Sequence, residues 1–200
     1  MRQEVQKMFD WLHFISYAAA ATITPGPNNI ISMSSAGQQG FRKSYPFNLG
    51  QWLGLSIVMV TGALFCNTLS AVIPKIKTPM LFVGAAYMLW LAWKTFRRSS
   101  VIEEDSRQVN FLSGVCLQFI NPKTFVYCVV SMEAYILPHY QGNYPALVGF
   151  GLLLAAIGAF NTLLWGLFGS AFKTLFTRYA RITNTVMALL LVYCAVALFL

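Results

Sequence analysis

The chain has 200 residues, of which 57% are hydrophobic and only 10% are charged, with a mean hydropathy of +0.59 and a net charge of +8. Soluble globular domains carry about 25% charged residues, so the composition excludes an ordinary soluble domain and predicts an all-α polytopic membrane protein. The basic residues fall in short clusters between apolar runs rather than along one stripe, which argues against a nucleic-acid partner.

Six apolar runs are each long enough for a membrane-spanning helix, which needs about 20 residues. They cover roughly 11–38, 47–73, 79–96, 111–136, 145–170 and 182–200. The polar segment 97–110 divides the single domain, residues 1–200, into halves of about 1–96 and 111–200. Because each half has an odd number of spans, the halves enter the membrane in opposite directions, as in an inverted repeat of two three-helix units.

The basic residues between the spans predict the orientation of the chain. Nine of them follow the first, third and fifth spans, four lie at the opposite ends of the spans, and Lys123 lies inside a span. Cytoplasmic loops are enriched in Lys and Arg, so the richer side is expected in the cytoplasm. Segment 97–110 is then a cytoplasmic linker and both termini face outward, although Lys75 and Lys77 on the outer side run against this trend.

The first apolar run contains the sequence Thr24-Pro25-Gly26-Pro27-Asn28-Asn29. Proline removes a backbone donor and clashes with the preceding turn, so a helix that passes through this sequence must break. Lipid cannot satisfy the freed backbone groups, and such a break is tolerated only where it is buried in protein or lines a polar cavity. The segment is therefore either a costly defect or a functional site.

A second break favours a site. Asn121-Pro122-Lys123 interrupts the fourth span at a similar depth, and paired interruptions of inverted halves are typical of the binding sites of secondary transporters. The end of one half-helix offers carbonyl groups and the start of the next offers N–H groups, which suit the ammonium and carboxylate of an amino acid. Asn28, Asn29 and Asn121 either cap the half-helices or bind the ligand, and the two roles are compatible.

Lys123 is the basic residue deepest in a predicted span. It lies about 18 Å along the helix from Phe111, and a charge at that depth costs roughly 2.5–3.5 kcal/mol and usually faces a cavity or a partner. Lys123 is expected either to attract a carboxylate or to bind carbonyl groups freed by the first break. Glu133 is better interpreted as a carboxylate at the membrane interface, with proton coupling as the alternative.

The other reactive residues do not form a recognisable site. The four cysteines lie inside apolar runs without a CxxC pair or a neighbouring histidine, so neither a disulfide framework nor a metal site is expected. They are Cys66, Cys116, Cys128 and Cys194. No nucleotide-binding, kinase or hydrolase motif is present, so the sequence predicts no cofactor and no ATP-driven step. A membrane enzyme or thiol relay remains the alternative from another functional class.

Four groups of residues along the chain form a shared pattern. They are Thr24-Pro25-Gly26-Pro27-Asn28, Gly40-Phe41-Arg42, Gly84-Ala85-Ala86-Tyr87 with Trp93-Lys94, and Asn121-Pro122-Lys123. This pattern resembles the LysE/RhtB family of amino-acid exporters over essentially the whole chain. Within that family the resemblance is strongest to the cysteine/O-acetylserine exporter branch, through Pro25–Ile30, Leu91–Lys94, Leu117–Phe119 and Leu189–Val196.

The proline motifs predict broken first and fourth helices, and the distribution of basic residues predicts both termini on the periplasmic side. The resemblance implies a multi-pass exporter of the bacterial inner membrane with six spans and the proton gradient as its driving force. It implies a small neutral amino acid as substrate, in the first place cysteine or O-acetylserine. Homoserine, threonine, another neutral amino acid or a basic one are the alternatives. The expected partners are this substrate and membrane lipid, and glycine-rich spans allow a homodimer without requiring one.

The expected substrate-binding residues are those of the two broken helices. They are Thr24, Pro25, Gly26, Pro27, Asn28, Asn29, Asn121, Pro122 and Lys123. Asn48 and Asn161 are further polar residues in apolar spans, and like Glu133 they match no feature of the family pattern. Their presence leaves the identity of the substrate open.

Overall fold

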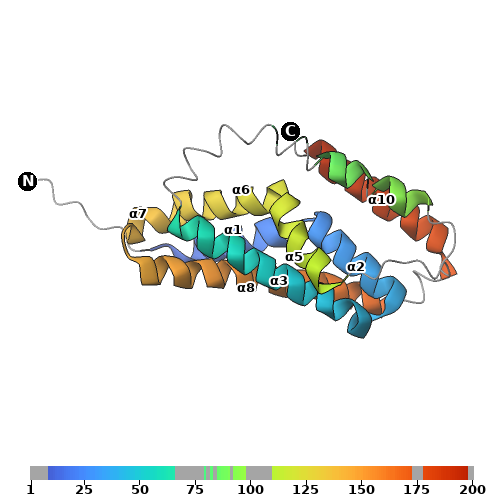
Figure 1. Ribbon diagram of the computed structural model, residues 1–200, viewed down its shortest axis with the longest axis horizontal. Coiled ribbons are helices and arrows are strands. Elements are labelled where there is room, and N and C mark those ends of the chain that lie inside the picture. Colours follow the sequence, from blue (N-terminus) through green and yellow to red (C-terminus); the bar gives the residue numbers. More distant parts are fainter. Residues whose placement is uncertain are drawn as a thin grey trace, which may run out of the picture.

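The computed structural model describes residues 9–65, 79, 82, 85–90, 92–97, 110–172 and 178–197. Every regular element in these ranges is a helix, which confirms the predicted all-α class. The elements are α1 (Trp11–Ile23), α2 (Pro27–Gln39), α3 (Phe41–Leu64), α5 (Phe111–Ile120), α6 (Pro122–Ser131), the π-helical η1 (Met132–Ile136), α7 (Leu137–Tyr140), α8 (Tyr144–Ala171) and α10 (Ala180–Ala197) (Figure 1). Most of the predicted linker 97–110, together with Lys75, Lys77 and Cys66, lies outside the described residues.

Short polar side chains begin several of these helices. A side-chain oxygen of the residue before the helix accepts a hydrogen bond from a backbone N–H of the first turn, which has no partner within the helix. These bonds join Asp10 to His13 at 3.0 Å, Asn110 to Ser113 at 2.8 Å, Asn121 to Lys123 at 3.1 Å and Asn143 to Ala146 at 3.2 Å. The local sequence thus fixes the starts of α1, α5, α6 and α8.

Gly40 alone joins α2 to α3. Its φ of 90° lies in the left-handed region that favours glycine, and it lets α3 begin at the next residue. The predicted start of the second span near residue 47 is therefore wrong, because α3 begins at Phe41 and contains Pro46 within its length. Arg42 and Lys43, predicted to lie between two spans, belong to the first turn of α3.

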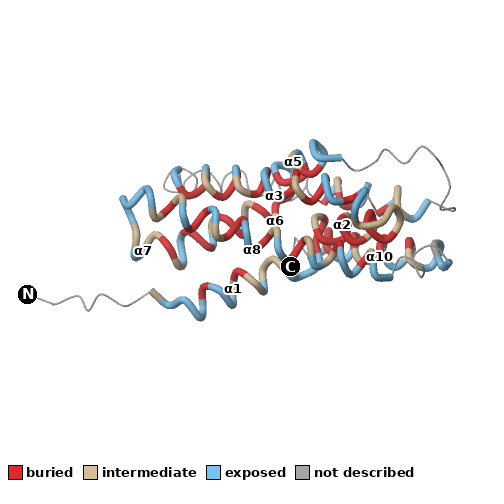
Figure 2. Tube along the Cα trace, turned by 90° about the horizontal axis from the view of Figure 1, so that it is seen from below, coloured by how far each residue is buried: buried red, intermediate tan, exposed pale blue. Residues whose placement is uncertain are grey.

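The bundle is built around α3 and α8 (Figure 1). α3 packs against α5 and α8, and α2 packs against α8 and α3. A Cβ added at Gly50 would collide with the carbonyl oxygen of Phe111, and one added at Gly114 would collide with that of Phe47. The backbones of α3 and α5 are therefore in direct contact, as small residues permit between membrane helices. Buried residues line the inward sides of the helices, as Figure 2 shows.

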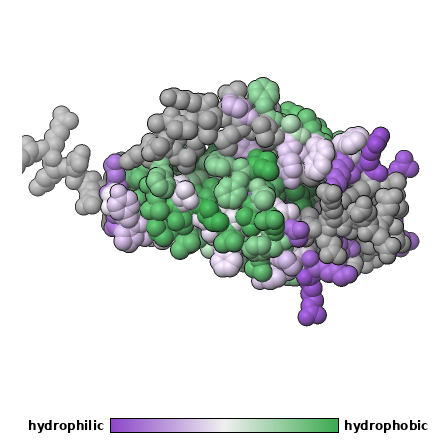
Figure 3. Space-filling model, in the orientation of Figure 1, coloured by the Kyte–Doolittle hydropathy of each residue, from purple (hydrophilic) through white to green (hydrophobic). Residues whose placement is uncertain are grey.

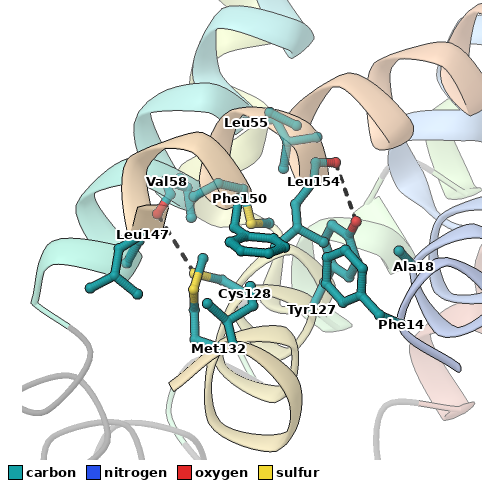
Figure 4. Close-up of a cluster of buried hydrophobic side chains, with 14 residues drawn as sticks. Phe14, Ala18, Leu55, Val58, Tyr127, Cys128, Met132, Leu147, Phe150 and Leu154 are labelled. Carbon is teal, nitrogen blue, oxygen red and sulfur yellow. Dashed lines mark hydrogen bonds between the residues drawn. The ribbon is translucent and has the colours of Figure 1, made fainter. Parts of the chain in front are cut away.

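Two apolar clusters fill the interior. The first joins α1, α3, α6, η1 and α8, and Figure 4 draws 14 of its side chains and labels ten of them. In it the Tyr127 hydroxyl donates to the Leu154 carbonyl at 3.2 Å, and the Cys128 thiol lies 3.7 Å from the Val58 carbonyl. The second cluster joins α2 and α10 to residues 85, 88 and 92, and includes Ile30 and Met88. The first cluster thus packs α1 against the bundle, and the second packs α2 against α10.

Two helices in the described part of the chain, α3 and α8, are long and apolar enough to cross a membrane. α5 and the stretch Pro122–Tyr140 form a third span if the pair, bent by 65°, counts as one. α1 and residues Arg181–Val196 of α10 are shorter apolar helices. Figure 3 shows apolar residues gathered in the middle of the visible face and hydrophilic residues towards its two ends, the pattern expected of a protein that spans a bilayer.

Candidate functional site

The first break lies where the sequence predicts it, but it is shorter. α1 ends at Ile23 and α2 begins at Pro27, so the non-helical residues are Thr24, Pro25 and Gly26. Pro27 occupies the first position of α2, where a missing N–H costs no helical hydrogen bond. The predicted members Pro27, Asn28 and Asn29 thus belong to the first turn of α2.

The second break consists of Asn121 alone. This residue ends α5 and begins α6, with φ −82° and ψ 107°, and Pro122 again takes the first helical position. The Asn121 side chain accepts from the backbone N–H of Lys123 at 3.1 Å, so it caps α6. Asn121 thus has the capping role that was predicted for it, and the binding of a ligand, which is compatible with that role, stays a prediction.

The two breaks face each other and are connected by hydrogen bonds between amide side chains. Asn121 Nδ2 donates to Asn28 Oδ1 at 3.1 Å, and Asn28 Nδ2 donates to Gln118 Oε1 at 2.9 Å. Gln118 Oε1 also accepts from the Thr124 hydroxyl at 3.1 Å. Because Asn28 lies in α2 and the other three residues lie in or beside α5 and α6, these bonds connect the first half of the chain to the second.

Lys123 makes a second connection between the breaks. Its Nζ donates to the Thr24 carbonyl and to the Thr24 hydroxyl, both at 2.8 Å, and lies 3.4 Å from the Pro25 carbonyl. A Cβ added at Gly26 would lie 3.2 Å from Lys123 Cδ and 3.3 Å from Nζ, so a glycine here makes room for the lysine. Of the two roles predicted for Lys123, the structure displays the binding of freed carbonyl groups.

A small cavity lies between the breaks, with about 40 Å³ open to the centres of water molecules. Its lining residues are Ala21, Thr22, Gly26, Asn28, Asn29, Leu55, Asn121, Lys123, Thr124, Tyr127, Gly158 and Thr162. None of them is acidic, so the cavity carries one formal positive charge and a set of neutral polar groups. Its electrostatics favour a ligand with a carboxylate.

α8 supplies polar groups that the sequence analysis did not assign to the site. Asn161 Nδ2 donates to the Thr22 hydroxyl at 2.5 Å, and the Thr162 hydroxyl lies 3.2 Å from Asn29 Oδ1. Trp165 Nε1 donates to the Ile23 carbonyl at 3.1 Å. The available signal was the pair Asn161-Thr162 inside an otherwise apolar span, because a polar residue in a membrane helix usually has a partner in the bundle.

Two glutamines lie directly behind the cavity wall. Gln51 Nε2 donates to the Asn28 carbonyl at 3.3 Å, while Gln118 Oε1 accepts from the Asn28 side chain. Gln51 Oε1 and Gln118 Nε2 are buried and have no hydrogen-bond partner in the described part of the protein. Buried polar atoms are usually paired, so these two mark a region able to rearrange or to receive water or ligand.

The predicted site residues separate into two groups. Gly26, Asn28, Asn29, Asn121 and Lys123 line the cavity. Thr24, Pro25, Pro27 and Pro122 lie outside the lining and shape the backbone of the two breaks.

Glu133 is exposed within η1 and does not line the cavity. Among residues 9–65, 110–172 and the other described positions, no group of three or more His, Cys, Asp or Glu side chains could hold a metal ion.

Residues 19–200 match the family model described as "LysE type translocator". The chain belongs to this family. It is 41% identical over 189 residues to the cysteine/O-acetylserine efflux protein of Escherichia coli (strain K12), with 93% of this chain and 95% of the relative covered. The relative of the same name from Shigella flexneri gives the same values, and no solved structure matches. Membership of the LysE family makes the chain a multi-pass membrane transporter rather than an enzyme.

Proposed function

We propose that this LysE translocator exports cysteine, O-acetylserine or both from the cytoplasm by secondary active transport, with the substrate bound between the two broken helices. The observation that carries the proposal is the pair of contacts across the breaks, Asn121 to Asn28 and Lys123 to Thr24, around a cavity with a cation and no acid. The names of its relatives in Escherichia coli and Shigella flexneri support the choice of substrate.

The chemistry of the cavity supports a small zwitterion. Lys123 offers a cation for a carboxylate, and the backbone N–H groups of Asn28 and Asn29, at the start of α2, donate to no capping side chain. The carbonyl groups at the end of α1 carry the opposite partial charge and suit an ammonium group. The limited space, about 40 Å³, favours a short side chain such as that of cysteine over the longer chains of basic amino acids.

The proposed architecture has six membrane spans arranged as two inverted halves in the bacterial inner membrane. α1 and α2 have 13 residues each, which together suffice for a broken first span, and α5 with α6 would form the matching fourth span. The distribution of basic residues supports a periplasmic location for both termini. Rocking of the two halves about the facing breaks would then alternate access to the cavity.

The proposal includes coupling to the proton gradient, with Glu133 as the candidate for the proton-carrying group. Glu133 is exposed in the π-helical turn that follows α6, so its protonation would act through α6, which also carries Lys123 and Thr124. π-helical turns inside α-helices are often associated with functional sites. A homodimer formed through glycine-rich or apolar outer surfaces is compatible with this mechanism, in which one chain holds a complete site.

An export assay tests the function. Cells that overproduce the protein should accumulate cysteine or O-acetylserine in the medium and lose it from the intracellular pool, as measured by mass spectrometry. Asn28→Ala removes both cross-break bonds of Asn28, each worth about 1 kcal/mol, so we expect export to fall about tenfold or more. Asn143→Ala, which removes a cap far from the cavity, is the matched control.

The same assay separates the alternatives. Export of homoserine, threonine or a basic amino acid in place of cysteine would replace the proposed substrate and leave the transport site in place. Equal export by the wild type, Asn28→Ala and cells without the protein would refute the proposal. Export by Glu133→Gln with an unchanged dependence on external pH would remove Glu133 from the mechanism.

A further inference from the structure

Every carbonyl group at the broken end of α1 already has a partner within the protein. The last carbonyl groups of a helix lack intrahelical donors, and in lipid they must be satisfied by other groups. Within the break and the helix end, the Ala20 carbonyl accepts from the Thr24 N–H, the Ala21 carbonyl from the Thr24 hydroxyl, and the Gly26 carbonyl from the Ile30 N–H. Asn29 Nδ2 donates to the Thr22 and Thr24 carbonyl groups, and Trp165 Nε1 donates to that of Ile23. Lys123 Nζ donates to the carbonyl groups of Thr24 and Pro25. The oxygens expected to bind a substrate ammonium are therefore occupied.

Lys123 is the charged member of this set of donors. An ammonium group has three N–H donors, and Lys123 Nζ faces three oxygens, two of Thr24 and one of Pro25. These oxygens lie at the carboxyl end of α1, where the helix dipole places a partial negative charge. The side chain of Lys123 thus occupies the position that the α-ammonium of an amino acid would take, and it binds with the same chemical group.

Lys123 pairs with no carboxylate among the residues that the structure describes. The described residues include two carboxylates, Asp10 and Glu133, both exposed and both outside the cavity lining. A bond from an ammonium to a carboxylate adds the attraction between two opposite full charges to the hydrogen bond, which a neutral carbonyl or hydroxyl acceptor does not supply. A carboxylate that enters the cavity would therefore compete effectively with the Thr24 and Pro25 oxygens for Nζ.

We propose that Lys123 is an internal substitute for the substrate ammonium, and that an amino acid binds by exchange. The substrate carboxylate withdraws the Lys123 ammonium from Thr24 and Pro25, and the substrate ammonium takes the vacated oxygens. This inference rests on the proposed function and specifies how the same site recognises its substrate. The exchange keeps the freed carbonyl groups paired throughout, which a membrane-embedded break requires.

The exchange makes the two charged groups of the substrate interdependent. An amine without a carboxylate cannot withdraw Lys123, so the oxygens that it needs stay occupied. A carboxylate without an amine can withdraw Lys123 but leaves the Pro25 carbonyl without this donor and the Thr24 carbonyl with Asn29 Nδ2 alone. The site therefore selects α-amino acids over their decarboxylated and deaminated analogues.

Binding of three ligands by the purified protein in detergent, measured by calorimetry, tests the exchange. The ligands are cysteine, cysteamine, which lacks the carboxylate, and 3-mercaptopropionate, which lacks the amine. The wild type should bind cysteine at least about tenfold more tightly than either analogue. In Lys123→Met the competitor is absent, so cysteamine should bind about tenfold more tightly than it does to the wild type, while cysteine and 3-mercaptopropionate should lose affinity.

Two further variants accompany this test. Lys94→Met removes a lysine that lies over the ring of Trp90, away from the cavity, and should change no affinity. Thr24→Val removes one oxygen that Lys123 leaves and the substrate ammonium takes, without a change of charge, so the affinity for cysteine should change little. The affinity for 3-mercaptopropionate, which withdraws Lys123 and puts no ammonium in its place, should rise severalfold. Thr185→Val, which removes a similar hydroxyl on α10, is the control for this substitution.

The outcomes separate the exchange from the function on which it rests. If Lys123→Met weakens all three ligands alike, or Thr24→Val does not raise the affinity for 3-mercaptopropionate, Lys123 only supports the break and the exchange is refuted, while export stands. If Lys123→Met does not fold, the Thr24→Val result decides. If the wild type binds neither cysteine nor O-acetylserine, the proposed substrate is wrong and the exchange is rejected with it.

Discussion

Asn121 provides the sharpest test of the contact between the two breaks. Its Oδ1 caps α6 by accepting from the Lys123 N–H at 3.1 Å, and its Nδ2 donates to Asn28 Oδ1 at 3.1 Å. Asn143 makes the same kind of cap at the start of α8, at 3.2 Å, and forms no other side-chain bond in the described structure. A comparison of Asn121→Ala with Asn143→Ala therefore isolates the bond that crosses the breaks.

The magnitude follows from these contacts. Loss of an asparagine cap costs about 1 kcal/mol, which is the full expected effect of Asn143→Ala. Asn121→Ala adds the loss of one amide hydrogen bond and leaves Asn28 Oδ1 without its donor, about 1–3 kcal/mol more. We therefore expect Asn121→Ala to lower the free energy of unfolding by about 2–4 kcal/mol. Asn121→Asp keeps a cap acceptor but loses the Nδ2 donor, so its loss of unfolding free energy should lie between the losses of Asn143→Ala and Asn121→Ala.

Reversible unfolding in mixed micelles of a mild detergent and dodecyl sulfate measures these differences. A double-mutant cycle of Asn28→Ala and Asn121→Ala should give a coupling energy of about 0.5–1.5 kcal/mol, because the two side chains bond directly. Equal effects of Asn121→Ala and Asn143→Ala, together with a coupling energy of zero, would refute the idea that this bond joins the two halves.

Two further predictions concern packing and pH. Gly50→Ala places a methyl group against the Phe111 carbonyl and should lower the midpoint of unfolding, whereas Gly149→Ala adds a methyl group in open space and should leave the midpoint unchanged or raise it. The backbone hydrogen bond from His13, followed by that from its side chain, lowers the pKa of Asp10 below the ordinary value of 3.8. The ionised Asp10 cap therefore stabilises α1 above about pH 3.8, and this stabilisation is lost as the pH falls through the lowered pKa. Between about pH 5 and pH 3, the unfolding midpoint of Asp10→Asn should fall less than that of the wild type. An equal fall in both proteins would contradict the role of Asp10 as a cap.

The positions of the two breaks could be predicted because they depend on the chain itself. Proline forbids a continuous helix whatever surrounds it, so Pro25, Pro27 and Pro122 fix the interruptions to within a few residues. The start of α3 was predicted wrongly because it depends on the positive φ of Gly40 and on the tolerance of a helix for Pro46 near its amino end. Neither property is visible in the hydrophobic pattern.

The candidate site was predicted only in part. The sequence identified Asn28, Asn29, Asn121 and Lys123, because polar residues beside a break in an apolar run have few explanations. It did not reveal that α8 satisfies the break through Trp165, since an indole N–H in a membrane helix has several possible roles.

The sequence by itself determined that this protein is a helical membrane protein and where two of its helices are interrupted, because composition and proline act locally and do not depend on the fold. It also predicted that a cation, Lys123, lies within a span. Only the tertiary structure decided what that cation binds: Lys123 Nζ reaches across 98 and 99 positions of the chain to the oxygens of Pro25 and Thr24. Such a contact depends on the packing of α6 against the end of α1, and no local pattern in the sequence encodes that arrangement.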